Sequence, residues 1–244
     1  MTTILVPFHA NERLPDGDVP VRADVTVQPR PLDGDAWDRL ARVCAATADA
    51  VAAAPGTPLV FSGDCLIAGG TVAGLQRTGV DPAVVWLDAH GDVHTLETTT
   101  SGYLGGLSLR LLTGAHPDRY ADRIGLRPVA PERAVLADAR DLDPAEADYL
   151  STSAIRRLTV PELSAETVPP GPFVLHVDVD VIDAADLPGL RFPVPHGPSA
   201  DEVLAACERL VATGRVAALD VACTWFPDAG AAQARLIARL AGLI

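Results

Sequence analysis

The sequence predicts a single α/β domain over residues 1–244, with a mostly parallel sheet of about eight strands and helices on both faces. Short runs of apolar and β-branched residues alternate with stretches of helical periodicity, as they do in doubly wound folds. The chain has 244 residues, which suits one hydrophobic core. Hydrophobic residues make up 48% of the sequence, and this composition argues against a disordered chain.

The predicted strands are short apolar runs that lie between turn-forming and helical segments. In chain order, the clearest runs are Ile4–Phe8, Leu59–Ser62, Val84–Asp88, Ala134–Ala137, Ile155–Thr159, Phe173–Asp180 and Val216–Val221. A further strand is expected at Asp24–Gln28. The polar segment Gly91–Tyr103 begins where a strand ends, and loops in this position carry the functional site in open α/β sheets.

Three helices are predicted from periodicity and capping residues. Residues Asp35–Ala54 place apolar side chains on one stripe, as expected of a helix that covers a sheet. A second helix begins at Ser199, its N-cap, with Glu202 completing a capping box, and Gly214 ends it. The last helix is expected at about Asp228–Leu243. No internal repeat or low-complexity linker divides the chain.

Charge and terminal sequence exclude several classes of protein. The formal net charge is −13 and the basic residues are scattered singly, so nucleic-acid binding is not expected. The N-terminus lacks a basic region before its apolar residues, and no apolar run reaches membrane-spanning length. We therefore expect a cytoplasmic protein with no membrane partner. The four cysteines are far apart and predict neither a disulfide framework nor a zinc ribbon.

Groups of acidic residues follow three of the predicted strands, where ligands bind in doubly wound sheets. The groups are Asp64 with Cys65, Asp88 with His90 and Asp92, and Asp178 with Asp180. For residues 88–94 alone, a solvated polar loop is the alternative. Asp178 and Asp180 belong to the most hydrophobic strand, where unpaired charges on one face would be costly.

Divalent metal ions are the best partners for these carboxylates. Lys and Arg are absent from Phe173 to Leu190, so no local salt bridge is available, although a distant basic residue stays open. Carboxylate oxygens suit manganese, and imidazole tolerates it. Two adjacent ions lower the pKa of a bridging water towards neutrality and polarise a substrate, so the expected chemistry is hydrolysis.

These motifs resemble those of the ureohydrolase family, which includes arginases and agmatinases. Asp88-Ala89-His90-Gly91-Asp92 resembles the family's Asp-Ala-His-x-Asp motif, and the segment His176–Asp183 resembles its Ser-x-Asp-x-Asp-x-x-Asp motif. Ser62-Gly63-Asp64-Cys65 is similar to the Gly-Gly-Asp-His motif, and Thr98–Gly102 is similar to the arginase substrate loop. The resemblance covers about residues 59–227. It implies a three-layer α/β/α arginase-like fold and two manganese ions.

The resemblance also implies a role for each site residue. Asp88 and Asp178 would bridge the ions; Cys65 and Asp92 would complete one metal site, and His90 and Asp180 the other. The implied substrate contacts are His94, Thr99 and Ser101 for an α-carboxylate, and Asp143 and Glu146 for an α-amino group. These contacts favour a guanidino amino acid over a decarboxylated substrate such as agmatine. The nucleophile would be the metal-bound hydroxide, with Asp92 as a candidate hydrogen-bond partner.

Three positions depart from the family pattern. Cys65 replaces a histidine ligand, Gly105 stands where arginase has its proton-shuttling histidine, and Cys223 replaces the glutamate that pairs with the guanidinium. A guanidinium keeps its charge at any relevant pH, so binding it without that carboxylate would be costly. An N-hydroxyguanidine is less basic and can bind neutral. The combination resembles the arginase-like hydrolases of D-cycloserine biosynthesis, and we expect N-omega-hydroxy-L-arginine to be cleaved to hydroxyurea and L-ornithine.

Two other functions stay open. The first is a conventional arginase or other guanidino-acid hydrolase in which another group, such as His116 or His196, supplies the acid, although both histidines are expected on solvated loops. The second is an inactive metal-binding relative that acts as a scaffold. Zinc, iron(II) and cobalt(II) are alternatives to manganese, since a thiolate ligand favours softer ions. A monomer is expected, because no C-terminal tail follows the last helix to hold a neighbouring subunit.

Some residues near the motifs have simpler expected roles. Trp86 and Trp225 are expected to contribute packing. His176 is expected to support the interior of its strand, with contact to a metal ligand as the alternative.

Overall fold

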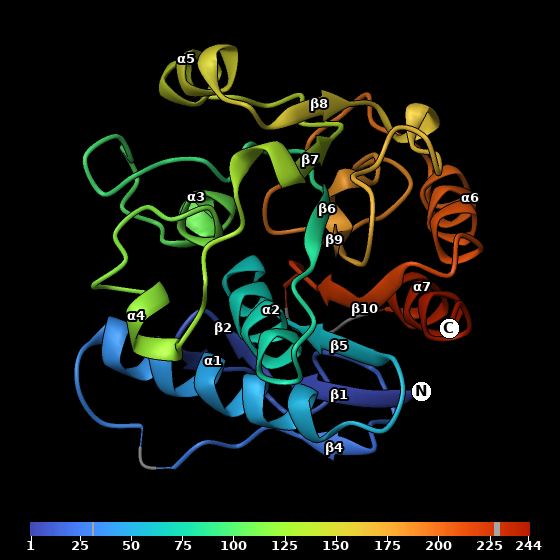
Figure 1. Cartoon of the computed structure of the whole chain (residues 1–244). Coiled ribbons are helices and arrows are strands. Elements are labelled where there is room, and N and C mark those ends of the chain that lie inside the picture. Colours follow the sequence, from blue (N-terminus) through green and yellow to red (C-terminus); the bar gives the residue numbers. More distant parts are fainter. Residues whose placement is uncertain (31, 227–229) are drawn as a thin grey trace.

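The structure is a computed structural model that describes residues 1–30, 32–226 and 230–244. Its centre is a sheet of eight strands in the order β4-β1-β5-β10-β9-β6-β7-β8 (Figure 1). Every pair of neighbouring strands in this sheet is parallel. The predicted α/β fold with an eight-stranded, parallel sheet is thus confirmed.

Each strand of this sheet lies within or next to a run predicted from the sequence. The strands are β1 (Thr2–Val6), β4 (Val25–Thr26), β5 (Pro58–Ser62), β6 (Ala83–Leu87), β7 (Ala134–Ala137), β8 (Arg156–Leu158), β9 (Phe173–Asp178) and β10 (Val216–Ala222). Two predicted ends were wrong. The first strand stops at Val6, because Phe8–His9 (β2) pairs with Glu12–Arg13 (β3) in a separate antiparallel hairpin. Strand β9 stops at Asp178, because Val179–Val181 form a 3₁₀ turn.

Seven α-helices lie in the described part of the chain. They are α1 (Ala36–Ala53), α2 (Ala68–Arg77), α3 (Ser108–Leu112), α4 (Ala121–Ile124), α5 (Pro144–Thr152), α6 (Ala200–Val211) and α7 (Ala231–Ala241). Helices α1, α6 and α7 correspond to the three predicted ones, but the predicted start of the last, Asp228, lies outside the described residues. Helix α6 has the predicted Ser199–Glu202 capping box. It ends at Val211, before the predicted Gly214, whose positive φ of 67° belongs to the following turn.

The sheet is the middle of three layers. Successive residues of a strand point to opposite faces, and two hydrophobic clusters follow from this alternation. In β6, Val84 and Trp86 belong to one cluster, whereas Val85 and Leu87 belong to the other. Helices α1 to α5 complete the first cluster, and α6 and α7 complete the second. Figure 1 shows α1 and α2 on one side of the sheet and α6 and α7 on the other.

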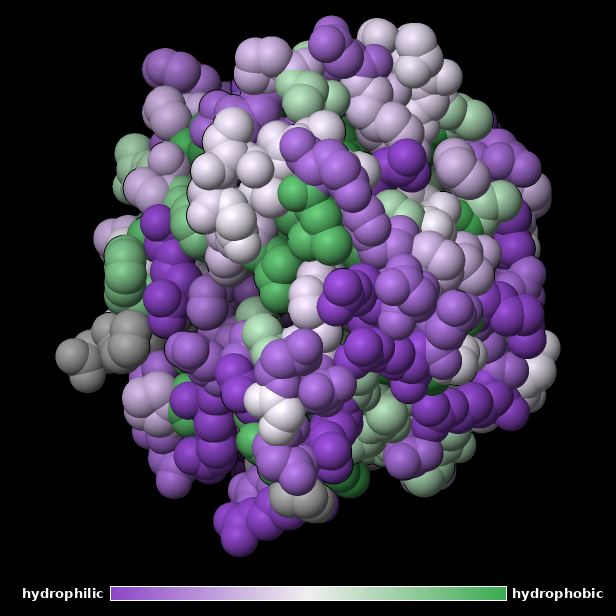
Figure 2. Space-filling model, turned by 90° about the vertical axis from the view of Figure 1, so that its left-hand side faces the viewer, coloured by the Kyte–Doolittle hydropathy of each residue, from purple (hydrophilic) through white to green (hydrophobic). Residues whose placement is uncertain are grey.

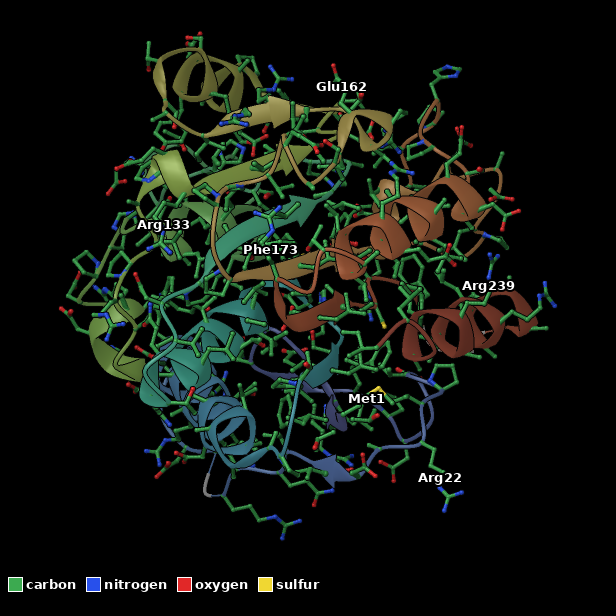
Figure 3. The ribbon with its side chains drawn as sticks, turned by 45° about the vertical axis from the view of Figure 1, so that its right-hand side comes forward. Met1, Arg22, Arg133, Glu162, Phe173 and Arg239 are labelled. Carbon is green, nitrogen blue, oxygen red and sulfur yellow. The ribbon has the colours of Figure 1, made fainter. Side chains whose placement is uncertain are left out.

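One face of the molecule is largely polar. Figure 2 shows hydrophilic residues over most of one side, with a small apolar group near its centre. Figure 3 shows Arg22 and Arg239 extending outward, while Phe173, at the start of β9, lies inside the molecule and is fully buried. Along the described residues, every helix is too short or too polar to cross a lipid bilayer.

Candidate metal centre

The predicted metal ligands meet at one edge of the sheet. Strands β5, β10, β9 and β6 are consecutive neighbours, and all four run in the same direction. Their carboxyl ends therefore lie side by side. The segments that leave these ends carry Cys65 after β5, Asp88 after β6 and Asp180 after β9, with Asp178 as the last residue of β9. Parallel pairing thus brings together residues that are more than 100 positions apart in the sequence.

Cys65, Asp88 and Asp178 form the first set of metal-binding donors. One ligand atom from each lies within 4.8 Å of the others. The Sγ atom of Cys65 lies 2.8 Å from Oδ2 of Asp178 and 3.9 Å from Oδ2 of Asp88. All three residues are buried. One thiol and two carboxylates are therefore close enough together to bind the same ion.

Asp88, His90 and Asp180 form the second set, again within 4.8 Å of one another. Nδ1 of His90 lies 3.4 Å from Oδ1 of Asp88 and 3.3 Å from Oδ2 of Asp180. Asp88 belongs to both sets and uses a different oxygen in each. A shared carboxylate is the arrangement expected of two adjacent ions.

Asp92 lies beside these sets without belonging to either. Its backbone has a positive φ of 53°, which is uncommon for a residue other than glycine. Within the described part of the chain, its buried Oδ2 atom has no hydrogen-bond partner. A buried carboxylate oxygen without a partner is costly, and a cation would satisfy it.

Burial and mutual repulsion make the cluster unfavourable for most of its ionised carboxylates. Asp88 is the exception: burial acts to raise its pKa, but its hydrogen bonds with His90 outweigh burial and lower it. Burial, followed by the neighbouring carboxylates, raises the pKa of Asp92 and of Asp178 well above the ordinary value. The same causes raise the pKa of Asp180 to about 6. Burial acts to lower the pKa of His90, but hydrogen bonds with Asp180 and Asp88 outweigh it and raise this pKa to about 12. The cluster needs additional positive charge to stay ionised near neutral pH.

These donors fit a pair of divalent cations. The set combines carboxylates, one imidazole and one thiol, and the unpartnered oxygen of Asp92 is available as a further ligand. No arginine lines the cavity beside the cluster within the described residues. The two sets contain Cys65 and His90 separately, as in the predicted division, but Asp178, predicted to bridge both sites, belongs only to the Cys65 set. The assignment of these residues to metal ions stays a proposal.

Short backbone turns hold the ligands in place. Asp64 caps the 3₁₀ turn of Cys65–Ile67 by accepting the Leu66 backbone N–H at 2.9 Å. The carboxylate of Asp178 accepts the N–H of Asp180 at 2.9 Å and the hydroxyl of Thr224 at 2.5 Å. Such contacts with ligand side chains fix their orientation before an ion binds. Thr224 was not identified from the sequence.

A row of buried polar side chains supports the centre from within the sheet. Trp86, His176 and Asp220 occupy paired positions on β6, β9 and β10. Nδ1 of His176 donates to Asp220 at 2.7 Å, and its Nε2 lies 3.3 Å from Sγ of Cys65. Trp86 stacks on His176 and donates its indole N–H to Asp88 at 3.0 Å. Trp86 is therefore more than the packing residue expected, and His176 contacts a predicted ligand.

A cavity of about 310 Å³ opens beside the cluster. Of the predicted substrate contacts, it is lined by His94, Ser101, Asp143 and Glu146. Thr99 is not among the lining residues; its hydroxyl accepts the Gly102 N–H at 3.1 Å within the loop. The lining also includes four side chains that were not identified from the sequence: Tyr103, Asp141, Phe192 and Thr224. A turn-rich loop sequence gives no signal that would have selected them.

The predicted α-amino contacts already have partners in the protein. Nε2 of His94 lies 3.0 Å from Oδ2 of Asp143. Glu146 is buried, and its carboxylate accepts the backbone N–H groups of Val93 and Asp143. Burial raises the pKa of Glu146, and these two hydrogen bonds oppose that shift. The Asp143 side chain is 56% exposed, so it stands at the mouth of the cavity.

A model of the arginase family matches residues 7–242. This chain belongs to the arginase family. Arginase from Bacillus subtilis is 35% identical over 170 residues, which are 64% of this chain and 57% of that protein. N(omega)-hydroxy-L-arginine amidinohydrolase from Streptomyces lavendulae is 30% identical over 158 residues, which are 63% of this chain and 56% of that protein. These matches span less than two thirds of either relative's own length.

Solved arginase structures share the whole fold. The crystal structure of arginase from Bacillus cereus superposes with a TM-score of 0.81 at 25% identity, covering 98% of this chain and 95% of that one. Arginase from Entamoeba histolytica gives a TM-score of 0.82 at 19% identity, covering 99% and 97%. The predicted three-layer arginase fold is thus confirmed.

Two departures from the arginase pattern lie at or behind the cavity wall. Gly105 lines the cavity, and the ring of Tyr103 occupies the space next to it. Cys223 is buried with apolar residues and does not line the cavity within the described chain; Thr224 lines it instead. Neither expected replacement for the shuttle histidine reaches the cavity: His116 accepts the Leu96 N–H in the loop, and His196 is exposed.

Proposed function

We propose that this member of the arginase family is a metal-dependent amidinohydrolase that cleaves N-omega-hydroxy-L-arginine to hydroxyurea and L-ornithine. One water is consumed: its oxygen becomes the carbonyl oxygen of hydroxyurea, and the bond from the guanidine carbon to the ornithine nitrogen breaks. The relative from Streptomyces lavendulae, which carries the name of this activity, supports the proposal. A role in antibiotic biosynthesis stays a prediction.

The observation that carries this proposal is the chemistry of positions 105 and 223. Gly105 has no side chain to donate a proton, and Cys223 is a buried thiol whose pKa is raised by burial. A charged guanidinium would therefore enter a cavity without the carboxylate that arginase offers at this place. A neutral N-hydroxyguanidine needs neither group. Loss of both side chains is consistent with one change of substrate.

The chain's own residues would orient the substrate between the cluster and the cavity mouth. When bound, two divalent cations would supply a nucleophile from water and polarise the guanidine group. Cys65, Asp88, His90, Asp92, Asp178 and Asp180 are the residues that would hold the cations. Asp143 and His94, at the mouth, would bind the charged α-amino and α-carboxylate groups, and Ser101 would add a hydroxyl. Thr99 would act only through the shape of its loop.

A conventional arginase is the second candidate, and Asp141 favours it. This carboxylate lines the cavity and offers a negative charge that a guanidinium could use. Most of the similar curated relatives are also named arginase. The proposed reaction and this alternative differ in one measurable respect, which is whether L-arginine itself is hydrolysed.

The test is a parallel assay of manganese-loaded protein with L-arginine, N-omega-hydroxy-L-arginine and agmatine. Ornithine and hydroxyurea from the hydroxylated substrate alone would support the proposal. Urea from L-arginine at a comparable rate would overturn it in favour of arginase. If no substrate reacts, the chain would be an inactive scaffold, and the amount of bound metal per chain would show whether it has kept its metal sites.

A further inference from the structure

Tyr103 forms part of the cavity wall and has no role in the proposed chemistry so far. Its ring lies 5.0 Å from that of Phe192, and it stacks on His9 at 5.6 Å. Both aromatic contacts hold the ring from the side. Phe192 in turn meets the ring of His90 at 6.1 Å, so this aromatic wall adjoins the second donor set.

The tyrosine ring fills the volume that a side chain at position 105 would need. A Cβ atom added to Gly105 would lie 2.4 Å from Cε1 and Cζ of Tyr103 and 2.5 Å from its hydroxyl oxygen. Real Cβ atoms do not approach other atoms so closely. Glycine at 105 and the observed position of Tyr103 therefore depend on each other. The phenol stands beside the position at which arginase has its shuttle histidine.

The hydroxyl of Tyr103 is held by a buried carboxylate. It donates to Oδ2 of Asp64 at 2.6 Å, and Asp64 is fully buried. The other oxygen of Asp64 accepts the Leu66 N–H, so this carboxylate cannot turn away without losing the cap of the Cys65 turn. Nε2 of His9 lies 3.4 Å from the hydroxyl. The hydroxyl proton of Tyr103 is thus used in the hydrogen bond to Asp64 and is not available to a ligand.

The oxygen of Tyr103 can offer a ligand only a lone pair. Burial, together with the negative charge of Asp64, raises the pKa of Tyr103, so the group stays a neutral phenol and is a poor acid. Donation to a carboxylate increases the negative character of the phenol oxygen, which makes it a stronger acceptor. Its best partner in the cavity is a neutral group that brings an O–H or N–H donor.

We propose that Tyr103 determines specificity by accepting a hydrogen bond from the N-hydroxyl group of the substrate. This inference rests on the proposed function. The hydroxyl extends one atom beyond the guanidine nitrogen, so L-arginine would leave this lone pair of the part-buried phenol oxygen without a donor, although the bond to Asp64 remains. Sites built around such a hydrogen bond reject an analogue that lacks the donor, because a buried polar group then loses its partner.

The test is Tyr103→Phe, which keeps the ring and removes the oxygen. We expect kcat/KM for N-omega-hydroxy-L-arginine to fall roughly tenfold to a hundredfold. The inhibition constant of L-arginine, measured against the same reaction, should stay unchanged or fall, because L-arginine makes no bond to this oxygen and the variant removes the lone pair that L-arginine leaves unpaired. Tyr149→Phe is the matched control: Tyr149 lies on α5, under the guanidinium of Arg110, and its substitution should alter neither constant.

If kcat/KM for the hydroxylated substrate and the binding of L-arginine weaken by the same factor, Tyr103 only maintains the loop. If neither constant changes, Tyr103 has no role. Both results overturn the inference. They leave the proposed function intact, since that function fails only if the unmodified protein does not hydrolyse the hydroxylated substrate.

A second variant tests the same contact if Tyr103→Phe does not fold. Gly105→Ala places a Cβ atom against the ring and should displace the hydroxyl from Asp64, with the same selective loss. Gly242→Ala is its control, since Gly242 lies at the end of α7, outside the cavity lining, and a Cβ there would meet nothing closer than 3.5 Å. If Gly105→Ala and Gly242→Ala behave alike, the inference is wrong.

Discussion

Cys65 is the residue whose chemistry depends most on a bound cation. Burial raises the pKa of its thiol well above the ordinary value, and the surrounding carboxylates raise it further. Without a cation, Cys65 is a neutral thiol that donates to Asp178. A metal ion binds the thiolate, so ion binding must release this proton. The Nε2 atom of His176 is close enough to contact the sulfur in either state.

We predict that Cys65→Ala removes the ion held by the first donor set, with affinity at that site falling at least about a hundredfold. The measurement is bound metal per chain, combined with the near-ultraviolet thiolate absorption of the cobalt-loaded protein. Cys207→Ala is the control, because Cys207 is buried in α6 within the second hydrophobic cluster. An unchanged thiolate absorption in Cys65→Ala would show that this sulfur is not a ligand.

Among the site residues, the sequence predicted those that lie at strand ends. It missed those whose role depends on a contact with a residue far away in the sequence. Asp88 and Asp178 could be found because each directly follows or ends an apolar strand. Thr224 and Tyr103 could not, since a hydroxyl in a loop has no distinctive pattern. Their importance depends on which carboxylate they meet, namely Asp178 for Thr224 and Asp64 for Tyr103, and only the folded structure determines that.

Helices α1 and α2 pack closely because glycines face the contact. A Cβ atom at Gly70 would lie 2.7 Å from the carbonyl oxygen of Cys44. One at Gly74 would lie 2.6 Å from Cβ of Val51 and 2.8 Å from the carbonyl oxygen of Ala48. Glycine lowers the intrinsic stability of a helix but allows the two backbones to approach. Helix α2 follows the Cys65 turn directly, so this contact also supports the site.

We predict that Gly74→Ala lowers the free energy of unfolding by about 1–3 kcal/mol, because overpacking exceeds the gain in helix propensity. At a solvent-exposed position inside a helix, the same change would raise the free energy of unfolding by about 1 kcal/mol. Chemical denaturation measures the difference. Gly242→Ala, where a Cβ would meet nothing closer than 3.5 Å, is the control with little expected change. A stabilised Gly74→Ala variant would contradict the tight contact.

This packing also explains which elements could be predicted. The central strands were found because nearly every position in them is apolar, whereas the edge strands β4 and β8 are short and largely exposed. Helices α1 and α6 were found from amphipathic periodicity and caps. Helix α2 contains three glycines in ten residues, and this glycine content is typical of a loop. Its helix is imposed by tertiary packing against α1. Helices α3 and α4 are only five and four residues long, too short to show a period.

For the whole molecule, the buried carboxylates connect metal binding with stability. The chain has a formal net charge of −13, and several of its acids meet at one edge of the sheet. The ionised forms of Asp92, Asp178 and Asp180 oppose folding without a cation, because the pKa of each is raised in the folded protein. Ions that bind only the folded chain stabilise it by mass action. The metal centre is thus expected to contribute to the stability of the fold as well as to catalysis.

Removal of metal should therefore make stability depend on pH in a defined direction. The pKa of Asp180 is raised from 3.8 to about 6 in the folded protein. Its protonated form favours folding, so the stabilisation is complete below pH 3.8 and is lost as the pH rises to about 6. The loss from this one group is about 3 kcal/mol. Asp92 and Asp178, whose pKa values are also raised, add to it.

We thus predict that the chelated protein loses stability between about pH 4 and 6, whereas the manganese-loaded protein does not, because bound cations replace the protons. Thermal unfolding of both forms across this range is the measurement. Asp180→Asn in the chelated protein should flatten part of the slope, since the amide does not titrate. Parallel pH profiles for the two forms would mean that these carboxylates do not hold the ions, and the metal would have to bind elsewhere.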